Sequence, residues 1–143
     1  MARVDEMQAL AASADEVWRL IGGYNTLSEW HPAVERSVLE DGGRMRRLSL
    51  RGGGGLLERL QAFSERDHHY AYTIEEGPLP VASYRSTLSV RDRGPSRGCE
   101  VSWSGEFTPA GASEADAVGV IRGIYRAGLD TLAKRFGDGR KGN

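Results

Sequence analysis

Apolar and polar residues alternate with a period of two over much of the chain, most clearly from Cys99 to Phe107. In this segment Val101, Trp103 and Phe107 share one side, while glutamates and serines occupy the other. Such alternation is typical of a β-strand that buries one face. The pattern predicts seven strands, over residues 4–11, 34–39, 44–51, 56–63, 70–75, 84–90 and 99–107.

The first predicted strand alternates only loosely, and we expect Val4, Met7 and Leu10 to form its apolar side. Segments rich in glycine, proline and aspartate separate most of the later strands, as turns do. Connections this short place consecutive strands antiparallel. Since each strand has only one apolar face, we expect the sheet to be covered on one side only.

The hydrophobic period becomes helical near the end of the chain. From Ser113 to Phe136, apolar residues fall in one arc at about 100° per residue and charged residues fall opposite. A helix of this length spans about 35 Å and can cover the apolar face of a whole sheet. The arc contains Val118, Ile121, Ile124, Tyr125, Leu129, Leu132 and Phe136.

Residues 13–32 combine a capped helix with a second, shorter helical turn. Ser13 and Glu16 have the spacing of a capping box, the glycines at 22–23 end the first helix, and Pro32 blocks continuation of the second. A helical pair, a run of antiparallel strands and one long helix together predict an α+β fold. The length of 143 residues fits a single domain over residues 1–143.

Acidic and basic residues nearly cancel, at a formal net charge of −1, which argues against nucleic-acid binding through bulk charge. The single cysteine, Cys99, cannot form an intramolecular disulfide and fits a reducing cytoplasm. The sequence contains no apolar run long enough to cross a bilayer and no signal-peptide pattern. We therefore expect a cytoplasmic protein without an integral membrane segment.

Several short motifs carry a family resemblance: SADEVW at 13–18, WHP at 30–32, LEDGG at 39–43, ERL at 58–60, GPLPV at 77–81, WSGEF at 103–107 and IYRAGLDTL at 124–132. Together with the order of elements, they resemble the START/SRPBCC superfamily, and the last motif is similar to its bacterial polyketide cyclase/dehydrase and lipid-transport branch. The resemblance implies the helix-grip fold, in which a seven-stranded curved sheet wraps around the C-terminal helix. It also implies a ligand cavity between sheet and helix, and we expect no cofactor.

Aromatic residues that share the predicted inner side of the sheet are Tyr70, Tyr72, Tyr84, Trp103 and Phe107. Tyrosine and tryptophan combine a large apolar body with one polar tip. Such a lining suits a mainly apolar ligand with a few polar groups. Core packing is enough to explain any one of these rings, but the set favours a pocket, whose walls we expect to include Tyr125 of the long helix.

Gly128 lies near the centre of the apolar arc of the long helix. Glycine costs about 1 kcal/mol of helix propensity relative to alanine, and it leaves space beside the helix, which again favours a cavity. Gly119 and Gly123 lie instead on the polar face. Contact with a partner subunit, as in a homodimer, and helix mobility explain those two equally well.

Glu58 is the strongest ionisable candidate, because it lies between Leu56 and Leu60 in the inner phase of its strand. A carboxylate in an apolar cavity is costly unless it is paired, and burial raises its pKa. Glu58 is then a general acid/base or an anchor for a ligand hydroxyl or amine. The competing interpretation is a strand that twists at the glycine turn and exposes Glu58 to solvent.

Arg46 is in the inner phase of the preceding strand and is a second candidate ligand contact, with a solvated side chain as the alternative. If the two strands pair around glycines 52–55, Leu50 faces Glu58 and Arg46 faces Ala62. The two charges then stand roughly 13 Å apart. We therefore expect no direct salt bridge between them, although both can reach one ligand.

His31, beside Trp30, titrates near neutral pH but has no carboxylate or nucleophile at motif spacing. We interpret these two residues as a pocket rim rather than as a catalytic site. His68-His69 lack a third metal ligand, so we expect no metal, and Cys99 lacks a paired base and should be inert.

Glycines 52–55 lack the lysine and hydroxyl residue of a phosphate loop. We interpret them as a mobile gate beside the cavity, with residues 77–81 as the other lip. The leading interpretation is a binding or carrier protein for a small, mainly apolar molecule that is lipid-, polyketide- or hormone-like, anchored by Glu58. The alternatives are a cofactor-free polyketide cyclase or dehydratase that uses Glu58 as acid/base, and a protein-interaction module with a vestigial cavity.

Overall fold

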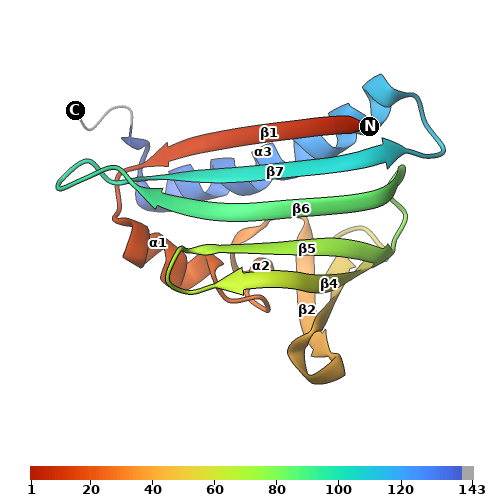
Figure 1. The fold of residues 1–143 in the computed structure, drawn as a ribbon, viewed down its shortest axis with the longest axis horizontal. Coiled ribbons are helices and arrows are strands. Elements are labelled where there is room, and N and C mark those ends of the chain that lie inside the picture. The colour runs from red at the N-terminus through yellow and green to blue at the C-terminus, as the bar shows by residue number, and fades with distance from the viewer. Residues whose placement is uncertain (140–143) are drawn as a thin grey trace.

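Seven strands form one antiparallel sheet in the computed structural model, which describes residues 1–139 (Figure 1). Their order is β1-β7-β6-β5-β4-β3-β2. Because β2 runs across the direction of β1 and β7, the sheet is strongly curled (Figure 1). The seven predicted strands are confirmed, with these bounds: β1 Ala2–Leu10, β2 Val34–Glu40, β3 Met45–Leu50, β4 Gly55–Ser64, β5 His69–Glu76, β6 Val81–Asp92 and β7 Cys99–Pro109.

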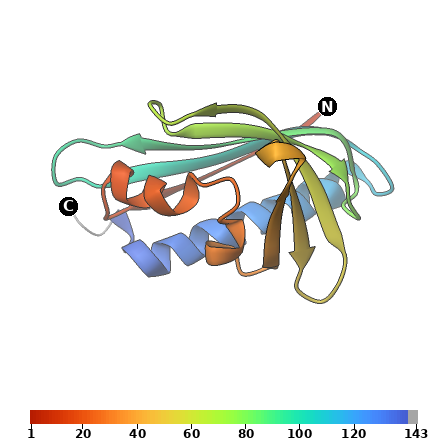
Figure 2. The same cartoon turned by 90° about the horizontal axis from the view of Figure 1, so that it is seen from below.

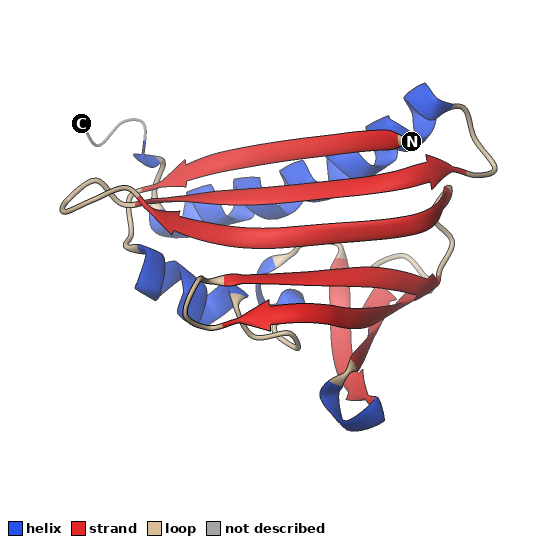
Figure 3. Ribbon diagram, in the orientation of Figure 1, coloured by secondary structure: helices blue, strands red, loops and turns tan. Residues whose placement is uncertain are grey.

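Three α-helices of the described chain cover one face of this sheet (Figures 2 and 3). They are α1 Ala14–Ile21, α2 Leu27–Trp30 and α3 Glu114–Phe136, and a short 3-10 helix, η1 Asp41–Gly43, joins β2 to β3. Figure 2 shows α1 and α2 beside α3 beneath the curled sheet. The α+β helix-grip fold predicted from the sequence is therefore confirmed.

The long helix α3 has the length and the apolar face that its sequence predicts. Its first turn is capped by Ser113, whose hydroxyl accepts the backbone N–H of Asp116 at 3.1 Å. Residues of the predicted arc that are fully buried against the sheet are Ile121, Tyr125, Leu129 and Leu132. No helix among residues 1–139 is long and apolar enough to cross a membrane.

The helical pair begins and ends where its sequence signals place it. The hydroxyl of Ser13 accepts the backbone N–H of Glu16 at 3.2 Å, and the backbone N–H of Gly22 closes the last turn on the carbonyl of Trp18 at 2.8 Å. Trp18 and Trp30 are both buried. Each of the two short helices therefore contributes one tryptophan to the core.

The apolar side of β1 differs from the expected one. Met7 is 53% exposed, whereas Val4 and Leu10 are buried together with Gln8. Strict alternation from Val4 to Leu10 places even-numbered residues inside, so Met7 faces outward. Gln8 is tolerated inside because its side-chain oxygen accepts a 2.6 Å hydrogen bond from Arg126 on the flank of α3.

The expected register of β3 and β4 is wrong, because the glycine turn lies two residues earlier than assumed. The structure pairs Arg46 with Glu58 and Leu48 with Leu56. The N–H of Leu50 donates to the carbonyl of Gly54 at 3.0 Å, which closes the turn before Gly55. The three glycines at 52–54 all have positive φ, so they form the turn and Gly55 already belongs to β4.

Candidate functional site

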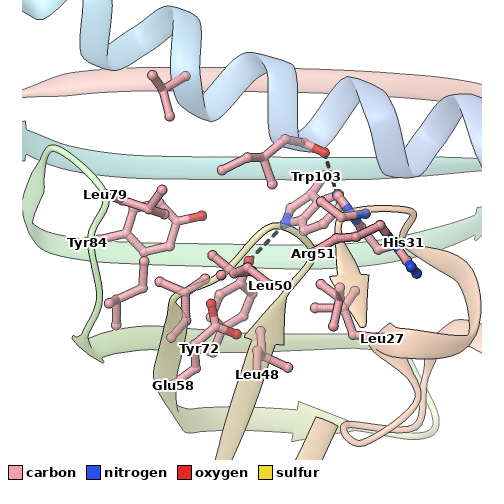
Figure 4. A pocket seen from close by; sticks show the side chains of 17 residues that line it. Leu27, His31, Leu48, Leu50, Arg51, Glu58, Tyr72, Leu79, Tyr84 and Trp103 are labelled. Atoms are coloured by element: carbon pink, nitrogen blue, oxygen red, sulfur yellow. Dashed lines mark hydrogen bonds between the residues drawn. The ribbon is translucent and has the colours of Figure 1, made fainter. Parts of the chain in front are cut away.

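A cavity of about 310 Å³ lies between the curled sheet, α2 and α3 (Figure 4). Its wall is mainly apolar and includes Leu48 of β3, Ile74 of β5 and Ile124 of α3. Its charged or polar members are His31, Arg51 and Glu58, and its large aromatic members are Tyr72, Tyr84 and Trp103. The fold thus encloses a space with an apolar surface and a few polar groups, as ligand pockets do.

The structure brings some of the candidate residues to this cavity and leaves others behind its wall. The residues that line it are His31, Glu58, Tyr72, Tyr84 and Trp103. The expectation that the remaining candidates line it is wrong: they pack or hydrogen-bond behind the lining residues. These are Trp30, Arg46, Tyr70, Tyr125 and Gly128.

Arg46 and Glu58 form a buried salt bridge, which corrects the expectation that they lie too far apart. Arg46 Nε donates to Glu58 Oε1 at 2.8 Å, and Nη2 lies 2.8 Å from the same oxygen. The Arg46 side chain is 0% exposed and that of Glu58 is 5% exposed. The register of β3 and β4 places the two residues directly opposite each other, which is why they meet.

Three tyrosines surround the guanidinium of Arg46. Its carbon atom Cζ lies 4.2, 5.5 and 4.9 Å from the ring centres of Tyr24, Tyr70 and Tyr72. Nη1 also donates to the backbone carbonyl of Tyr24 at 2.8 Å and to the Tyr70 hydroxyl at 3.2 Å. Ring faces and carbonyl oxygens both attract a cation, so this cage fixes the position of Arg46 and, through it, that of Glu58.

The charge state of Glu58 depends on two opposing effects. Burial raises the pKa of its carboxyl above the ordinary value, and the charge of Arg46 together with its hydrogen bond opposes that rise. A guanidinium does not lose its proton in a protein. The carboxylate of Glu58 is therefore the counter-ion that offsets the desolvation cost of burying Arg46.

A hydroxyl network joins the sheet to α3 behind and beside the cavity. Trp103 Nε1 donates to the hydroxyls of Tyr72 and Ser86, at 3.1 Å each. Ser86 donates to the carbonyl of Ser104 at 2.8 Å, and its oxygen lies 2.9 Å from the Tyr125 hydroxyl, which also contacts Tyr84. Burial raises the pKa of Tyr72 and Tyr84 well above the ordinary value, so both stay neutral.

Gly105 of β7 makes room for this network. A Cβ atom at Gly105 would overlap the hydroxyl oxygen of Tyr125. The Tyr125 ring stacks on that of Trp103, with 4.6 Å between ring centres and 14° between planes. Tyr125 thus supports the cavity wall from behind, instead of lining it.

Gly128 does not border the cavity, which corrects the expectation that it leaves room for a ligand. A Cβ atom there would lie 2.8 Å from His31 Cδ2 and 2.9 Å from carbon atoms of both Trp30 and Trp103. Three aromatic rings therefore fill the space that this glycine leaves. Its role is to let α3 approach the helical pair closely.

His31 lines the cavity but has both ring nitrogens engaged. Nε2 donates to the carbonyl of Ile124 at 2.7 Å, and Nδ1 accepts the backbone N–H of Ala33 at 3.1 Å. Burial lowers the pKa of His31, with the Ile124 bond opposing the change. A neutral imidazole that is bonded through both nitrogens and ties α2 to α3 favours a structural role, and the position at a pocket rim stays a prediction.

The two predicted lips of the cavity, residues 52–55 and 77–81, both reach its wall. Gly53 and Leu79 line it, and a Cβ atom at Gly54 would lie 3.9 Å from Pro78. Arg51 lies beside them and donates from Nε to the carbonyl of Pro32 at 2.9 Å. That these segments open and close remains a prediction.

The other candidates for chemistry are explained by local structure. His68 bonds Asp15 at 2.9 Å and stacks on Trp18, with 5.2 Å between ring centres. Cys99 is buried, and burial raises the pKa of its thiol to about 11. Within residues 1–139, no cluster of histidine, cysteine and acidic side chains has the geometry to hold a metal ion.

Comparison with known proteins identifies the family. The family model described as "Polyketide cyclase / dehydrase and lipid transport" matches residues 1–137. The chain belongs to this family. Its members by description include both cyclases and lipid-transport proteins, so family membership supports a ligand-binding or cyclase role in general.

Solved structures agree with this membership, whereas no curated protein matches the chain. The protein XoxI from Bacillus cereus is 38% identical with a TM-score of 0.92, over 95% of this chain and 96% of that one. An uncharacterised protein from Bacillus thuringiensis is 38% identical with a TM-score of 0.92, over 96% of this chain and 100% of its own. Zhui aromatase/cyclase from a Streptomyces species shares the fold, at 16% identity and a TM-score of 0.75, over 94% of this chain and 92% of that one.

Two residues of the site were not identified as candidates from the sequence. Ser86 is a buried residue of β6, but a small hydroxyl in a strand gives no sign in the sequence that it joins Trp103 to Tyr125. Tyr24 lies in the irregular segment between α1 and α2, where no period indicates a buried side. Its contact with Arg46 depends on how that segment folds back over β3.

Proposed function

We propose that the protein binds or carries a small, mainly apolar molecule in the cavity between the sheet and α3. The volume of about 310 Å³ lies at the lower end of the range of about 300–1,000 Å³ for small-molecule pockets. The observation that carries the proposal is an apolar wall interrupted by the carboxylate of Glu58. A core built only for packing leaves few voids and no charged group facing one.

Lipid-, polyketide- and hormone-like molecules share the chemistry that this wall would recognise. Tyr72, Tyr84 and Trp103 present ring surfaces, and Leu48, Ile74 and Ile124 present aliphatic ones. Glu58 is the anchor for a ligand polar group. The description of the family, which includes lipid transport, supports the same class of ligand.

A tryptophan that fills the cavity tests this proposal. Leu50 projects into the cavity near the end of β3 (Figure 4), whereas Leu39 of β2 is 44% exposed and does not line it. We expect Leu50→Trp to weaken uptake of the neutral dye Nile red by about tenfold or more, because overpacking a filled site costs about 1–3 kcal/mol. Leu39→Trp adds the same volume at the surface and should leave uptake unchanged.

Fluorescence titration of the two variants and the unchanged protein gives the comparison, with circular dichroism to show that all three are folded. Equal dye affinity in Leu50→Trp and Leu39→Trp would place the dye outside the cavity and contradict the proposal.

A cofactor-free cyclase or dehydratase is the second candidate. It is favoured by the family description and by a cavity that is lined by both Glu58 and Tyr72. In such an enzyme Glu58 would move a proton and a tyrosine would donate to a developing oxyanion. Glu58→Gln should then abolish most turnover of a polyketide-like substrate, whereas a carrier should lose only part of its affinity.

A further inference from the structure

The salt bridge between Arg46 and Glu58 leaves one carboxylate oxygen for a ligand. Arg46 Nε and Nη2 both approach Glu58 Oε1, each at 2.8 Å, so the pair is not bidentate. Among residues 1–139, no group donates a hydrogen bond to the other oxygen, Oε2. Glu58 lines the cavity and Arg46 does not (Figure 4). The oxygen without a partner is therefore on the ligand side of the pair.

The charge balance at this end of the cavity restricts which ligand groups can bind Oε2 of Glu58. Arg46 is 0% exposed and carries a permanent positive charge. Among the described residues, Glu58 is the acidic residue that lies within ion-pair distance of the Arg46 guanidinium. The pair is thus neutral as a unit. A cationic ligand group would add a net charge to an apolar enclosure, which is costly, and a ligand carboxylate would face Oε2 with a like charge.

An uncharged hydroxyl of the ligand can donate a hydrogen bond to Oε2 of Glu58, and it adds no charge to the apolar cavity. The tyrosine hydroxyls that line the cavity, and that of Ser86 behind them, contact other partners. Tyr84 contacts Tyr125 and Tyr72 accepts from Trp103, and Ser86 has both a donor and an acceptor contact. The acceptor position at Glu58 is therefore open to the ligand.

We propose that the cavity selects molecules that carry an uncharged hydroxyl on an aromatic or alicyclic body, and that Arg46 is the positioning residue that sets this selectivity by holding Glu58 with one oxygen free. The inference rests on the proposed binding function and adds the class of ligand. The rings of Tyr72, Tyr84 and Trp103 complement a flat apolar body.

Three probes of similar size test the proposal on the unchanged protein: beta-naphthol, its methyl ether and beta-naphthoate. Isothermal titration calorimetry should show beta-naphthol binding about 10- to 100-fold more tightly than its methyl ether, as expected for a hydrogen bond to a charged acceptor. Beta-naphthoate should bind more weakly than either. Equal affinity for beta-naphthol and its ether leaves the binding function standing and overturns the selectivity. Binding of none of the three overturns both.

A paired substitution locates the selectivity in the salt bridge. Removing Glu58 alone would leave Arg46 buried without its counter-ion and endanger folding, so Arg46→Met and Glu58→Leu are combined, because apolar replacement of both partners of a buried pair is tolerated. In this double variant, the ratio of affinities for beta-naphthol and its methyl ether should fall to about twofold or less, while the ether still binds. If the ratio of affinities for beta-naphthol and its methyl ether were the same as in the unchanged protein, a group other than Glu58 would bind the ligand hydroxyl.

Discussion

Gly105→Ala should destabilise the protein through a single atom, although the backbone of β7 accepts alanine. The new Cβ would overlap the Tyr125 hydroxyl oxygen, so Tyr125 must move and lose its contacts with Tyr84 and Ser86. Each hydrogen bond is worth about 0.5–1.5 kcal/mol, and displacing a packed ring costs about 1–3 kcal/mol. Alanine offsets about 0.5–1 kcal/mol of this loss because it restricts the unfolded chain, so the net loss is about 1–5 kcal/mol.

A loss of this size lowers the melting temperature by about 3–15 °C for a chain of this length. Urea and thermal unfolding followed by circular dichroism measure it. In a double-mutant cycle, Tyr125→Phe removes the oxygen and leaves Cζ as the nearest atom, at 3.3 Å from the new Cβ. In that background, Gly105→Ala should cost less than about 1 kcal/mol. An unchanged or higher stability of Gly105→Ala alone, or an equal cost in both backgrounds, would show that the Tyr125 hydroxyl does not exclude a Cβ atom at position 105.

Two further predictions concern the packing of α3 and the buried imidazole. Gly128→Leu should lower the free energy of unfolding by about 2–4 kcal/mol, because Trp30, His31 and Trp103 already fill the space beside Gly128. The control Gly123→Leu, at a position with nothing within 4 Å, should instead raise the free energy of unfolding by about 0.5–1 kcal/mol. A Gly128→Leu variant that is more stable in chemical denaturation would contradict this packing. Burial lowers the pKa of His31 in the folded protein. Below about pH 6.5, the unfolded chain therefore takes up a proton at this histidine that the folded protein does not. The free energy of unfolding should fall as the pH drops from about 7 to 5, by at most about 1.4 kcal/mol per pH unit for this group. The His31→Gln variant should show a shallower fall in urea denaturation at stepped pH, and identical slopes would mean that His31 titrates normally in the folded state.

The elements of the fold were predictable because their signals are local. Alternation along β7 and the helical arc of α3 each depend on neighbours within a few residues, and the caps at Ser13 and Ser113 depend on the next turn. Met7 was misplaced because a loose pattern was read by hydrophobicity alone. The alternation of β1 places Gln8 inside, and its acceptable partner, Arg126, lies 118 positions further along the chain.

The site was less predictable because it depends on register and on contacts between distant segments. Four consecutive glycines allow several centres for the turn between β3 and β4, and a shift of the centre by two residues decides whether Arg46 meets Glu58 or Ala62. Strand alternation made both charged residues candidates for the inner face but left a solvated position open for each, and their pairing required the register. Gly128 was linked to a cavity because its sequence context could not show that Trp30, from α2, fills the space beside it.

Intermolecular nuclear Overhauser effects can show whether a small apolar molecule occupies the space between the sheet and α3. With the methyl ether of beta-naphthol as the probe, which requires no hydroxyl selectivity, we expect effects to methyl groups of Leu48, Ile74 and Ile124, all of which line the cavity. Effects confined to exposed side chains such as Val38 and Leu39, with none to these three residues, would show that the molecule binds at the surface and not in the cavity.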